Sequence, residues 1–173
     1  IQNAAESTNQ GLEIDGRWAV NDWLMLSGSV AWLDAEYKKF DSASCPNFFE
    51  ETVCDFSGKT LPYSPDFSSS LTADVFSPIT ETLSFVGGLT WSYSTEYFTD
   101  GTLDPFAIQD SYSKLSGRIG IAATDGQWSL TLIGKNLTDE AILDVTQPLF
   151  GYYLGYTNMP RTVTLQGTYH FGN

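Results

Sequence analysis

Apolar and polar side chains alternate along most of this chain with a period of two, which is typical of β-strands that have one dry face and one wet face. The clearest case is residues 161–171, where Val163, Leu165 and Tyr169 alternate with threonine and glutamine side chains. Six other segments repeat the pattern. We therefore predict seven strands, at residues 10–20, 23–40, 66–76, 82–98, 111–124, 127–135 and 161–171.

The predicted connections alternate between short turns and long loops. The short ones are residues 21–22, 77–81 and 125–126, which carry the Asn, Asp, Gly or Pro residues of hairpin turns. The long ones are residues 41–65, 99–110 and 136–160. This alternation indicates an all-β, antiparallel up-and-down meander of about seven strands. Outer-membrane barrels have the same contrast between short turns at one end and long loops at the other.

The two faces of the predicted strands differ in chemistry. One face collects leucine, isoleucine, valine, phenylalanine and tryptophan side chains and no charged residue. The other collects serine, threonine and charged side chains, among which we expect ion pairs between basic and acidic residues: Arg17, Lys114, Arg118 and Lys135 with Glu13, Asp15 and Asp74, or with other parts of the protein. A soluble β-sandwich would show the same alternation, but a strand over residues 23–40 exceeds the usual length of roughly 3–10 residues and favours a membrane barrel.

Composition narrows the choice of protein class. Aromatic residues make up 14% of the chain and charged residues 17%, whereas roughly a quarter of a typical soluble domain is charged. No segment approaches the ~20 apolar residues of a membrane-spanning helix. The net charge of −13, with eight Lys and Arg, argues against nucleic acid as a partner. The chain starts at Ile1 without a basic and apolar leader, so we expect a processed chain or an internal part of a longer one.

The two cysteines, Cys45 and Cys54, lie close together in the first long loop. A zinc site would need further cysteine or histidine ligands nearby, and the sequence offers none there. A local disulfide is therefore favoured over two free thiols, and it implies an oxidising compartment.

The order of several segments resembles the C-terminal part of the β-barrel of TonB-dependent outer-membrane receptors. The resemblance rests mainly on WSLTLIGKNLTDE at residues 128–140, the Tyr- and Gly-rich loop after it, and a final strand that opens with Pro160-Arg161-Thr162. The segments LPYSPDFSSSLTADV at residues 61–75 and YSKLSGRIGIAATDG at residues 112–126 are also similar to that family.

The resemblance implies a place in a 22-stranded transmembrane β-barrel with an N-terminal plug domain inside it. Residues 1–173 would form the C-terminal portion of that barrel, and the plug and earlier strands would lie outside this chain. The protein would then reside in a bacterial outer membrane, with the long loops extracellular. Expected partners are outer-membrane lipid and lipopolysaccharide, the remainder of the barrel with its plug, and the inner-membrane TonB complex through the missing N-terminal part.

No arrangement of residues indicates an enzyme, a cofactor or a metal site. His170 is the only histidine, and the acidic loop residues do not follow the spacing of a calcium loop. The resemblance instead implies import of a scarce ligand such as a siderophore, cobalamin or a carbohydrate. Aromatic side chains of the loops are the candidate ligand contacts: Phe48, Phe49, Tyr97, Phe98, Phe106, Phe150, Tyr152, Tyr153 and Tyr156. Loop packing and contacts to lipopolysaccharide are the alternative roles of these side chains.

Two other functions stay open at this level. The first is a small non-transporting outer-membrane barrel or adhesin, which requires an even number of strands. The second is a soluble extracellular carbohydrate-binding β-sandwich, which requires a second layer over the apolar face.

Overall fold

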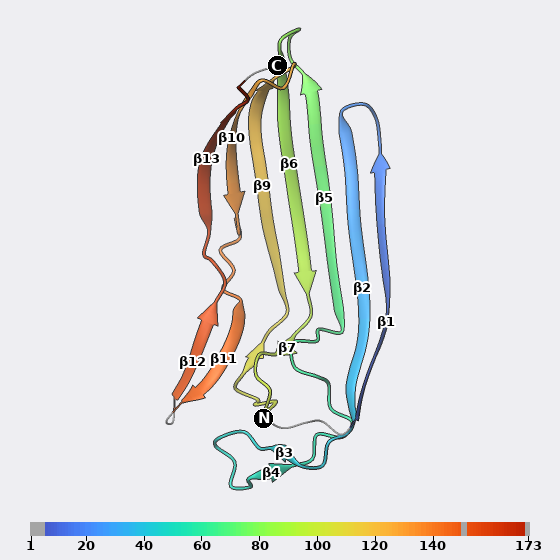
Figure 1. The fold of residues 1–173 in the computed structure, drawn as a ribbon, viewed down its shortest axis with the longest axis vertical. Helices are drawn as coiled ribbons and strands as arrows, with labels where there is room; N and C mark the ends of the chain where they lie inside the picture. The colour runs from blue at the N-terminus through green and yellow to red at the C-terminus, as the bar shows by residue number, and fades with distance from the viewer. Residues whose placement is uncertain (1–5, 150–151, 172–173) are drawn as a thin grey trace.

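The sheet of this protein is a single antiparallel layer of seven strands. The computed structural model describes residues 6–149 and 152–171, and its main sheet has the order β1-β2-β5-β6-β9-β10-β13 (Figure 1). The seven strands are β1 (Glu6–Ala19), β2 (Leu24–Lys39), β5 (Phe67–Pro78), β6 (Leu83–Ser94), β9 (Tyr112–Ala123), β10 (Trp128–Lys135) and β13 (Thr162–Tyr169). Each long strand pairs with the next one along the chain, so the predicted meander is confirmed. Within the described ranges, no helix has the length and apolar character needed to cross a membrane.

Short turns and long loops gather at opposite ends of the sheet (Figure 1). At the short-turn end, the Asn21 side chain accepts hydrogen bonds from the main-chain N–H groups of Trp23 and Leu24 at 3.0 and 2.9 Å. Gly126 closes the turn between β9 and β10 with φ 76°, a conformation that glycine adopts without steric cost. Both turns depend on one or two neighbouring residues, which explains why they could be predicted from short sequence signals.

The long loops carry three small hairpins that the sequence pattern did not predict. They are β3 (Ala43–Ser44) with β4 (Val53–Cys54), β7 (Tyr97–Phe98) with β8 (Ile108–Gln109), and β11 (Leu143–Leu149) with β12 (Tyr152–Thr157). The predicted strand 82–98 was too long, because β6 ends at Ser94. Its partner β5 begins only at Phe67, where Thr95 exchanges hydrogen bonds with the Phe67 main chain. Beyond this point Phe98 pairs with Ile108 instead.

One face of the sheet is apolar and uncovered. Strand pairing places Leu132 opposite both Ile119 and Leu165 on this face, as the sequence pattern predicted. Leu12, Leu89, Ile119 and Leu165 leave 50–66% of their surface exposed. No second sheet covers them among the described residues, and the buried apolar cluster lies in the loops instead. A soluble β-sandwich is therefore not the fold of this chain.

Aromatic rings form a belt across the long-loop end of the apolar face. Trp32 contacts Phe67 at 5.2 Å between ring centroids, Phe67 contacts Tyr93 at 6.1 Å, and Tyr93 contacts Trp91 at 6.2 Å. Tryptophan and tyrosine favour the boundary between membrane and water. From Leu24 to Trp32 the same face spans about 26 Å at ~3.3 Å per residue, which suits the apolar band of roughly 25 Å in outer-membrane barrels.

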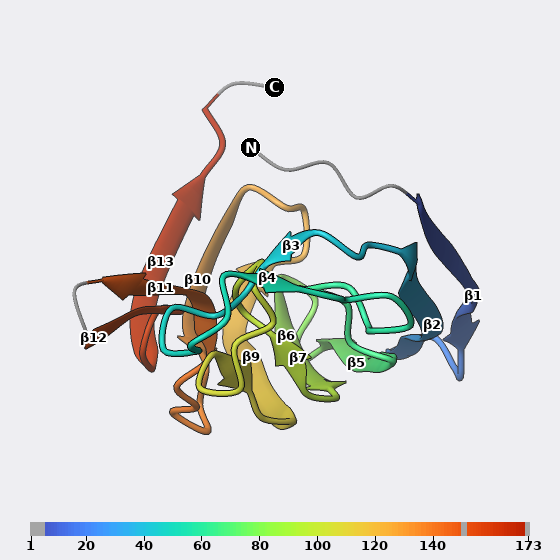
Figure 2. The ribbon, with the colours of Figure 1, turned by 90° about the horizontal axis from the view of Figure 1, so that it is seen from below.

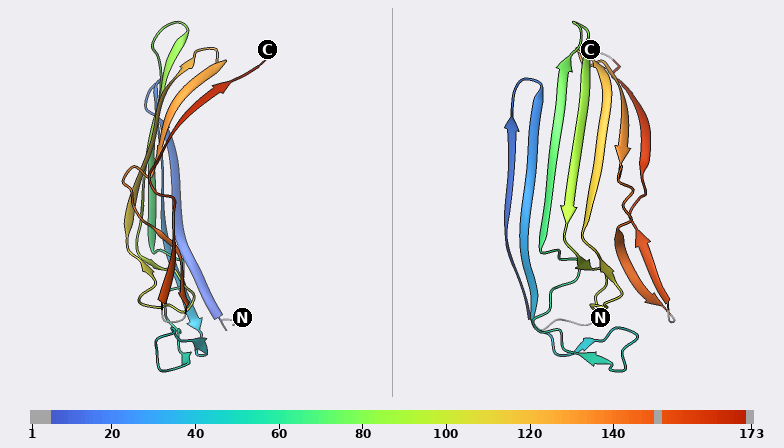
Figure 3. Two further views of the ribbon diagram at one scale, coloured as in Figure 1. Left: turned by 90° about the vertical axis from the view of Figure 1, so that its left-hand side faces the viewer. Right: turned by 180° about the vertical axis from the view of Figure 1, so that it is seen from behind.

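Figures 2 and 3 show that the sheet is curved. Figure 2 shows the β3–β4 loop lying across the hollow of this curve. Hydroxyl pairs join neighbouring strands on the polar face of the sheet, with 2.9 Å between the Oγ atoms of Ser29 and Ser70. Arg118 and Asp74 form a 2.9 Å ion pair, which is one of the pairs predicted for this face. A single curved layer with one apolar and one polar face fits part of the 22-stranded barrel.

The last long loop is tied together at its base by Asn136 and Asp139. Both residues have positive φ, 50° and 57°. The buried Asn136 side chain accepts the Glu140 N–H at 3.0 Å and donates to the carbonyls of Glu140 and Met159 at 2.9 and 3.2 Å. Asp139 accepts the Arg161 N–H at 3.0 Å and pairs with its guanidinium at 3.4 Å. These contacts hold the ends of β10 and β13 side by side, and we call them the neck of the loop.

Leu137, which directly follows Asn136 in the neck, folds back onto Gly134 on the apolar face. A Cβ on Gly134 would lie only 2.5 Å from Leu137 Cδ2, so an added methyl group would displace the Leu137 side chain. Gly134→Ala is expected to lower the free energy of unfolding of the full-length protein by about 1–3 kcal/mol, because the new methyl group overlaps a packed side chain. Gly16→Ala is the matched control on the same face, since nothing lies within 4 Å of its added carbon. Chemical denaturation in lipid measures both, and equal losses would contradict this packing role.

Candidate functional site

The three long loops, residues 40–66, 95–111 and 136–161, pack into one unit that we call the loop layer. Thr99 lies at its centre and is fully buried. Its carbonyl accepts hydrogen bonds from the Tyr63 hydroxyl at 2.5 Å and from the Thr146 N–H at 3.1 Å. Its hydroxyl lies 2.7 Å from that of Thr146. Tyr63, Thr99 and Thr146 come from the first, second and third loops, so one buried residue ties all three together.

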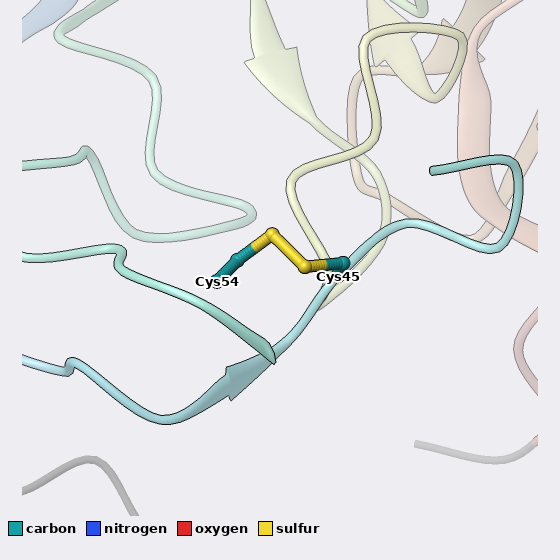
Figure 4. Close-up of a disulfide and its surroundings, with 2 residues drawn as sticks. All are labelled: Cys45 and Cys54. Carbon is teal, nitrogen blue, oxygen red and sulfur yellow. A yellow bond between two sulfur atoms is a disulfide. The ribbon is translucent and has the colours of Figure 1, made fainter. Parts of the chain in front are cut away.

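A small apolar cluster and a disulfide fix the first loop. Phe40, Phe56 and Leu103 are buried together, and the half-buried ring of Phe98 packs against them. Cys45 and Cys54 form the predicted disulfide, with 5.1 Å between their Cα atoms (Figure 4). The bridge closes the short segment between them, whose outer part carries two of the candidate aromatic residues.

Two buried carboxylates organise the second loop. Asp104 is fully buried, and its two oxygens accept hydrogen bonds from the Phe106 N–H at 2.9 Å and the Tyr153 hydroxyl at 2.7 Å. Asp100 accepts the Asp104 N–H at 3.1 Å and the Thr102 hydroxyl at 2.7 Å. Each of these four oxygens is therefore engaged in holding the loop. Reasoning from the sequence missed both residues, although Asp side chains in turns commonly accept a hydrogen bond from the main chain two residues further on, as Asp104 does from Phe106.

Three of the predicted ligand-contacting aromatics meet at the outer end of the loop layer. The Tyr153 ring lies 5.4 Å from that of Phe48 and 5.8 Å from that of Phe106, centroid to centroid. Phe48 and Phe106 leave 51% and 71% of their surface exposed. We call these three residues the aromatic cluster. Its members come from three different loops, and it presents flat apolar rings to solvent.

The other predicted contacts lie elsewhere. Phe49 is exposed beside Phe48, whereas Phe98 packs within the loop layer. Tyr152 and Tyr156 are exposed on β12, on the face opposite to Tyr153, because successive side chains of a strand point to opposite sides. Phe150 lies outside the described residues.

Tyr97 belongs to a separate hollow on the polar face, directly beneath the loop layer. The hollow has a volume of about 490 Å³. Its lining includes Glu13, Ser29, Ser70, Ser92, Tyr63, Tyr97 and Tyr112. Desolvation, together with the neighbouring Tyr112 hydroxyl, raises the pKa of Tyr97 to about 12. The sequence could not predict this hollow, because its serines come from three strands, whereas Tyr63, Tyr97 and Tyr112 come from two loops and the start of β9.

Tyr153 also controls how the third loop attaches to the second. Desolvation raises its pKa to about 12, and the hydrogen bond to Asp104 acts in the same direction. Since this pKa lies above the ordinary value of 10.0, the stabilisation is complete below pH ~10 and is lost as the pH rises towards 12. Tyr153→Phe keeps the ring but removes the donor to Asp104. We expect faster amide hydrogen exchange in residues 143–157 and a smaller tyrosine absorbance change near pH 12.

The control for this prediction is Tyr152→Phe, on the opposite face of the same strand. It should leave the exchange rates of residues 143–157 as they are in the parent protein. Unchanged exchange in Tyr153→Phe would show that the Asp104 hydrogen bond does not hold the hairpin.

Comparisons with known proteins agree with this architecture. The model of the family described as TonB dependent receptor-like, beta-barrel matches residues 1–137. The fold is similar to that of the ferric yersiniabactin uptake receptor FyuA from Yersinia pestis, with a TM-score of 0.75 and 16% identity over 93% of this chain and 23% of that one. It is also similar to the siderophore receptor PiuA from Acinetobacter baumannii, with a TM-score of 0.68 and 18% identity over 93% of this chain and 21% of that one.

The chain thus spans about a fifth to a quarter of the length of these receptors. No curated protein matches it. Members of the matched family are outer-membrane receptors and transporters, and the open sheet, apolar outer face and long loops described above are what part of such a barrel requires. The chain belongs to the family of TonB-dependent receptor β-barrels.

Proposed function

We propose that this chain forms the C-terminal portion, residues 1–173, of the barrel of an energised importer in the bacterial outer membrane. The observation that carries the proposal is the aromatic cluster, where three long loops bring Phe48, Phe106 and Tyr153 into contact at one exposed surface. A rigid surface of exposed rings is suited to binding, because flat side chains provide large contact area with little loss of conformational freedom.

The proposed orientation places the loop layer outside the cell and the short turns in the periplasm. The disulfide supports it, because such bonds persist in oxidising surroundings. The aromatic belt below the loops would then mark the outer boundary of the membrane, next to lipopolysaccharide. The polar face would surround the plug domain, which lies in another part of the same protein.

The proposed mechanism is binding and release without bond chemistry. A scarce ligand docks on the loop layer and on the outer parts of the plug. The inner-membrane TonB complex then pulls on an N-terminal segment, using the proton gradient, and opens a path along the polar face. Phe49, Tyr97, Phe98, Phe150, Tyr152 and Tyr156 remain candidate contacts in this scheme, with the aromatic cluster as the first contact.

Uptake by cells that carry the full-length receptor tests the proposal. Labelled ferric siderophores, cobalamin and oligosaccharides are offered with and without an uncoupler of the proton gradient. At least one of them is expected to enter in a gradient-dependent manner. The triple variant F48A/F106A/Y153A should weaken its binding by about tenfold or more, since buried aromatic contacts dominate many interfaces.

Phe76→Ala is the control, because Phe76 is an exposed aromatic on β5 near the short-turn end. It should leave ligand binding unchanged. If the uncoupler changed the uptake of none of the probes, the import function would be overturned. Normal affinity in the triple variant would instead move the ligand site away from the aromatic cluster.

A further inference from the structure

The hollow beneath the loop layer is lined by hydroxyl groups, and we propose that it binds a neutral, hydroxyl-rich ligand of the carbohydrate class. This assignment rests on the proposed import function and specifies its substrate class. The hollow lies on the polar face of the sheet, where its lining includes the loop residues Tyr63, Pro65 and Tyr97. Its position beneath the loops places it along the proposed route of the ligand.

A row of serines forms the floor of the hollow. Ser29, Ser70 and Ser92 lie directly opposite one another on β2, β5 and β6. The hydroxyls of Ser29 and Ser70 are 2.9 Å apart and hydrogen bonded. A hydroxyl group both donates and accepts hydrogen bonds, so a row of them matches the alternating donors and acceptors of a sugar ring.

Tyrosine rings from the loops and from the start of β9 complete the hollow. Tyr63, Tyr97 and Tyr112 line it together with the serines. Each ring offers an apolar surface and a polar tip, which is the combination that a sugar with its apolar ring face and its hydroxyl edge requires. Tyr63 also donates a hydrogen bond to Thr99, so this part of the hollow is attached to the centre of the loop layer and is held in place.

Charge argues against an anionic ligand such as a ferric catecholate. Among the described residues that line the hollow there is no lysine or arginine, and Glu13 supplies a carboxylate. The three long loops contain twelve Asp and Glu residues but only two basic ones, Lys59 and Arg161. Such a field repels anions and slows their approach, whereas it leaves the approach of a neutral ligand unchanged.

The size of the hollow agrees with this assignment. About 490 Å³ lies within the roughly 300–1,000 Å³ of typical small-molecule sites. The aromatic cluster above it offers stacking surfaces for the same class of ligand. The hollow and the aromatic cluster therefore both favour a ligand with rings and hydroxyl groups over a charged ligand.

Isothermal titration of the purified full-length receptor tests the proposal. The probes are short neutral oligosaccharides of glucose, mannose and xylose, and the ferric tris-catecholate complex as the anionic alternative. We expect one of the sugar series to bind and the ferric complex not to bind. The double variant S70A/S92A should weaken sugar binding by about tenfold or more, because it removes two hydroxyl partners while keeping the size of the site.

The control variant is Ser129→Ala, which removes a polar-face hydroxyl of β10 near the short-turn end, away from the hollow. It should leave sugar binding unchanged. Binding of the ferric complex, or of none of the probes, would overturn the assignment. So would an S70A/S92A receptor that binds sugar normally but shows altered unfolding of the plug, because the hollow would then be a seat for the plug.

The proposed import function can fail separately from this assignment. Gradient-dependent uptake of a ferric complex together with no sugar binding would keep the import function and reject the carbohydrate class. Sugar binding that depends on Ser70 and Ser92, without gradient-dependent uptake of any probe, would keep the hollow as a sugar site and reject import.

Discussion

Replacing Leu132 with arginine is expected to lower the free energy of unfolding of the full-length receptor in lipid by about 2–4 kcal/mol. Leu132 lies within β10, opposite Ile119 and Leu165 on the uncovered apolar face. A guanidinium group at this position must leave water and enter hydrocarbon, where no partner compensates for its lost hydration. This effect and that of replacing Asn136 are the two largest that we expect from a single substitution.

Thr131→Arg is the matched control, because it places the same side chain one position away on the polar face. Its expected effect is below about 1 kcal/mol, since that face stays hydrated. Unfolding by guanidinium in liposomes measures both variants. Equal losses for Leu132→Arg and Thr131→Arg would contradict the assignment of the two faces.

Replacing Asn136 with alanine is expected to destabilise the neck of the last loop by about 2–4 kcal/mol. The change removes the three hydrogen bonds from the Asn136 side chain to the main chain of Glu140 and Met159, and a typical hydrogen bond contributes about 0.5–1.5 kcal/mol. It also forces alanine into a backbone with φ 50°, which costs about 1–2 kcal/mol relative to glycine. Amide exchange in residues 136–160 should accelerate, while exchange in β2 and β5 should not.

Asn136→Gly separates the two causes. Glycine loses the same hydrogen bonds but adopts positive φ without strain, so it should be about 1–2 kcal/mol less damaging than alanine. Identical behaviour of the two variants would assign the whole effect to hydrogen bonding. Normal exchange in both would show that Asn136 does not hold the neck.

The strands of the sheet could be predicted because their chemistry is local and repetitive. In β13, for example, the alternation of Val163 and Leu165 with threonine and glutamine is visible in the sequence alone. The end of β6 could not be predicted in the same way. Tyr97 and Phe98 continue the apolar pattern, but the ladder stops where β5 begins, and that depends on a distant segment.

The candidate site was only partly predictable. Aromatic residues in long loops identify candidates, but the meeting of Phe48, Phe106 and Tyr153 depends on how three loops fold against one another. Thr99 and Asp104, which hold those loops together, are polar and fully buried. A polar residue in a loop is ordinarily exposed, so no pattern in the sequence distinguishes these two from their solvated neighbours.

The β11–β12 hairpin has consequences for how this receptor can change over evolutionary time. Its inner side is constrained, because Thr146 and Tyr153 contact the other loops. Its outer side, with Tyr152, Leu154 and Tyr156, is exposed. Bacteriophages and antibodies select for new cell-surface residues. In the orientation proposed above, the outer positions of this hairpin can therefore diversify one by one to escape such recognition, while the inner positions keep the three loops attached to one another.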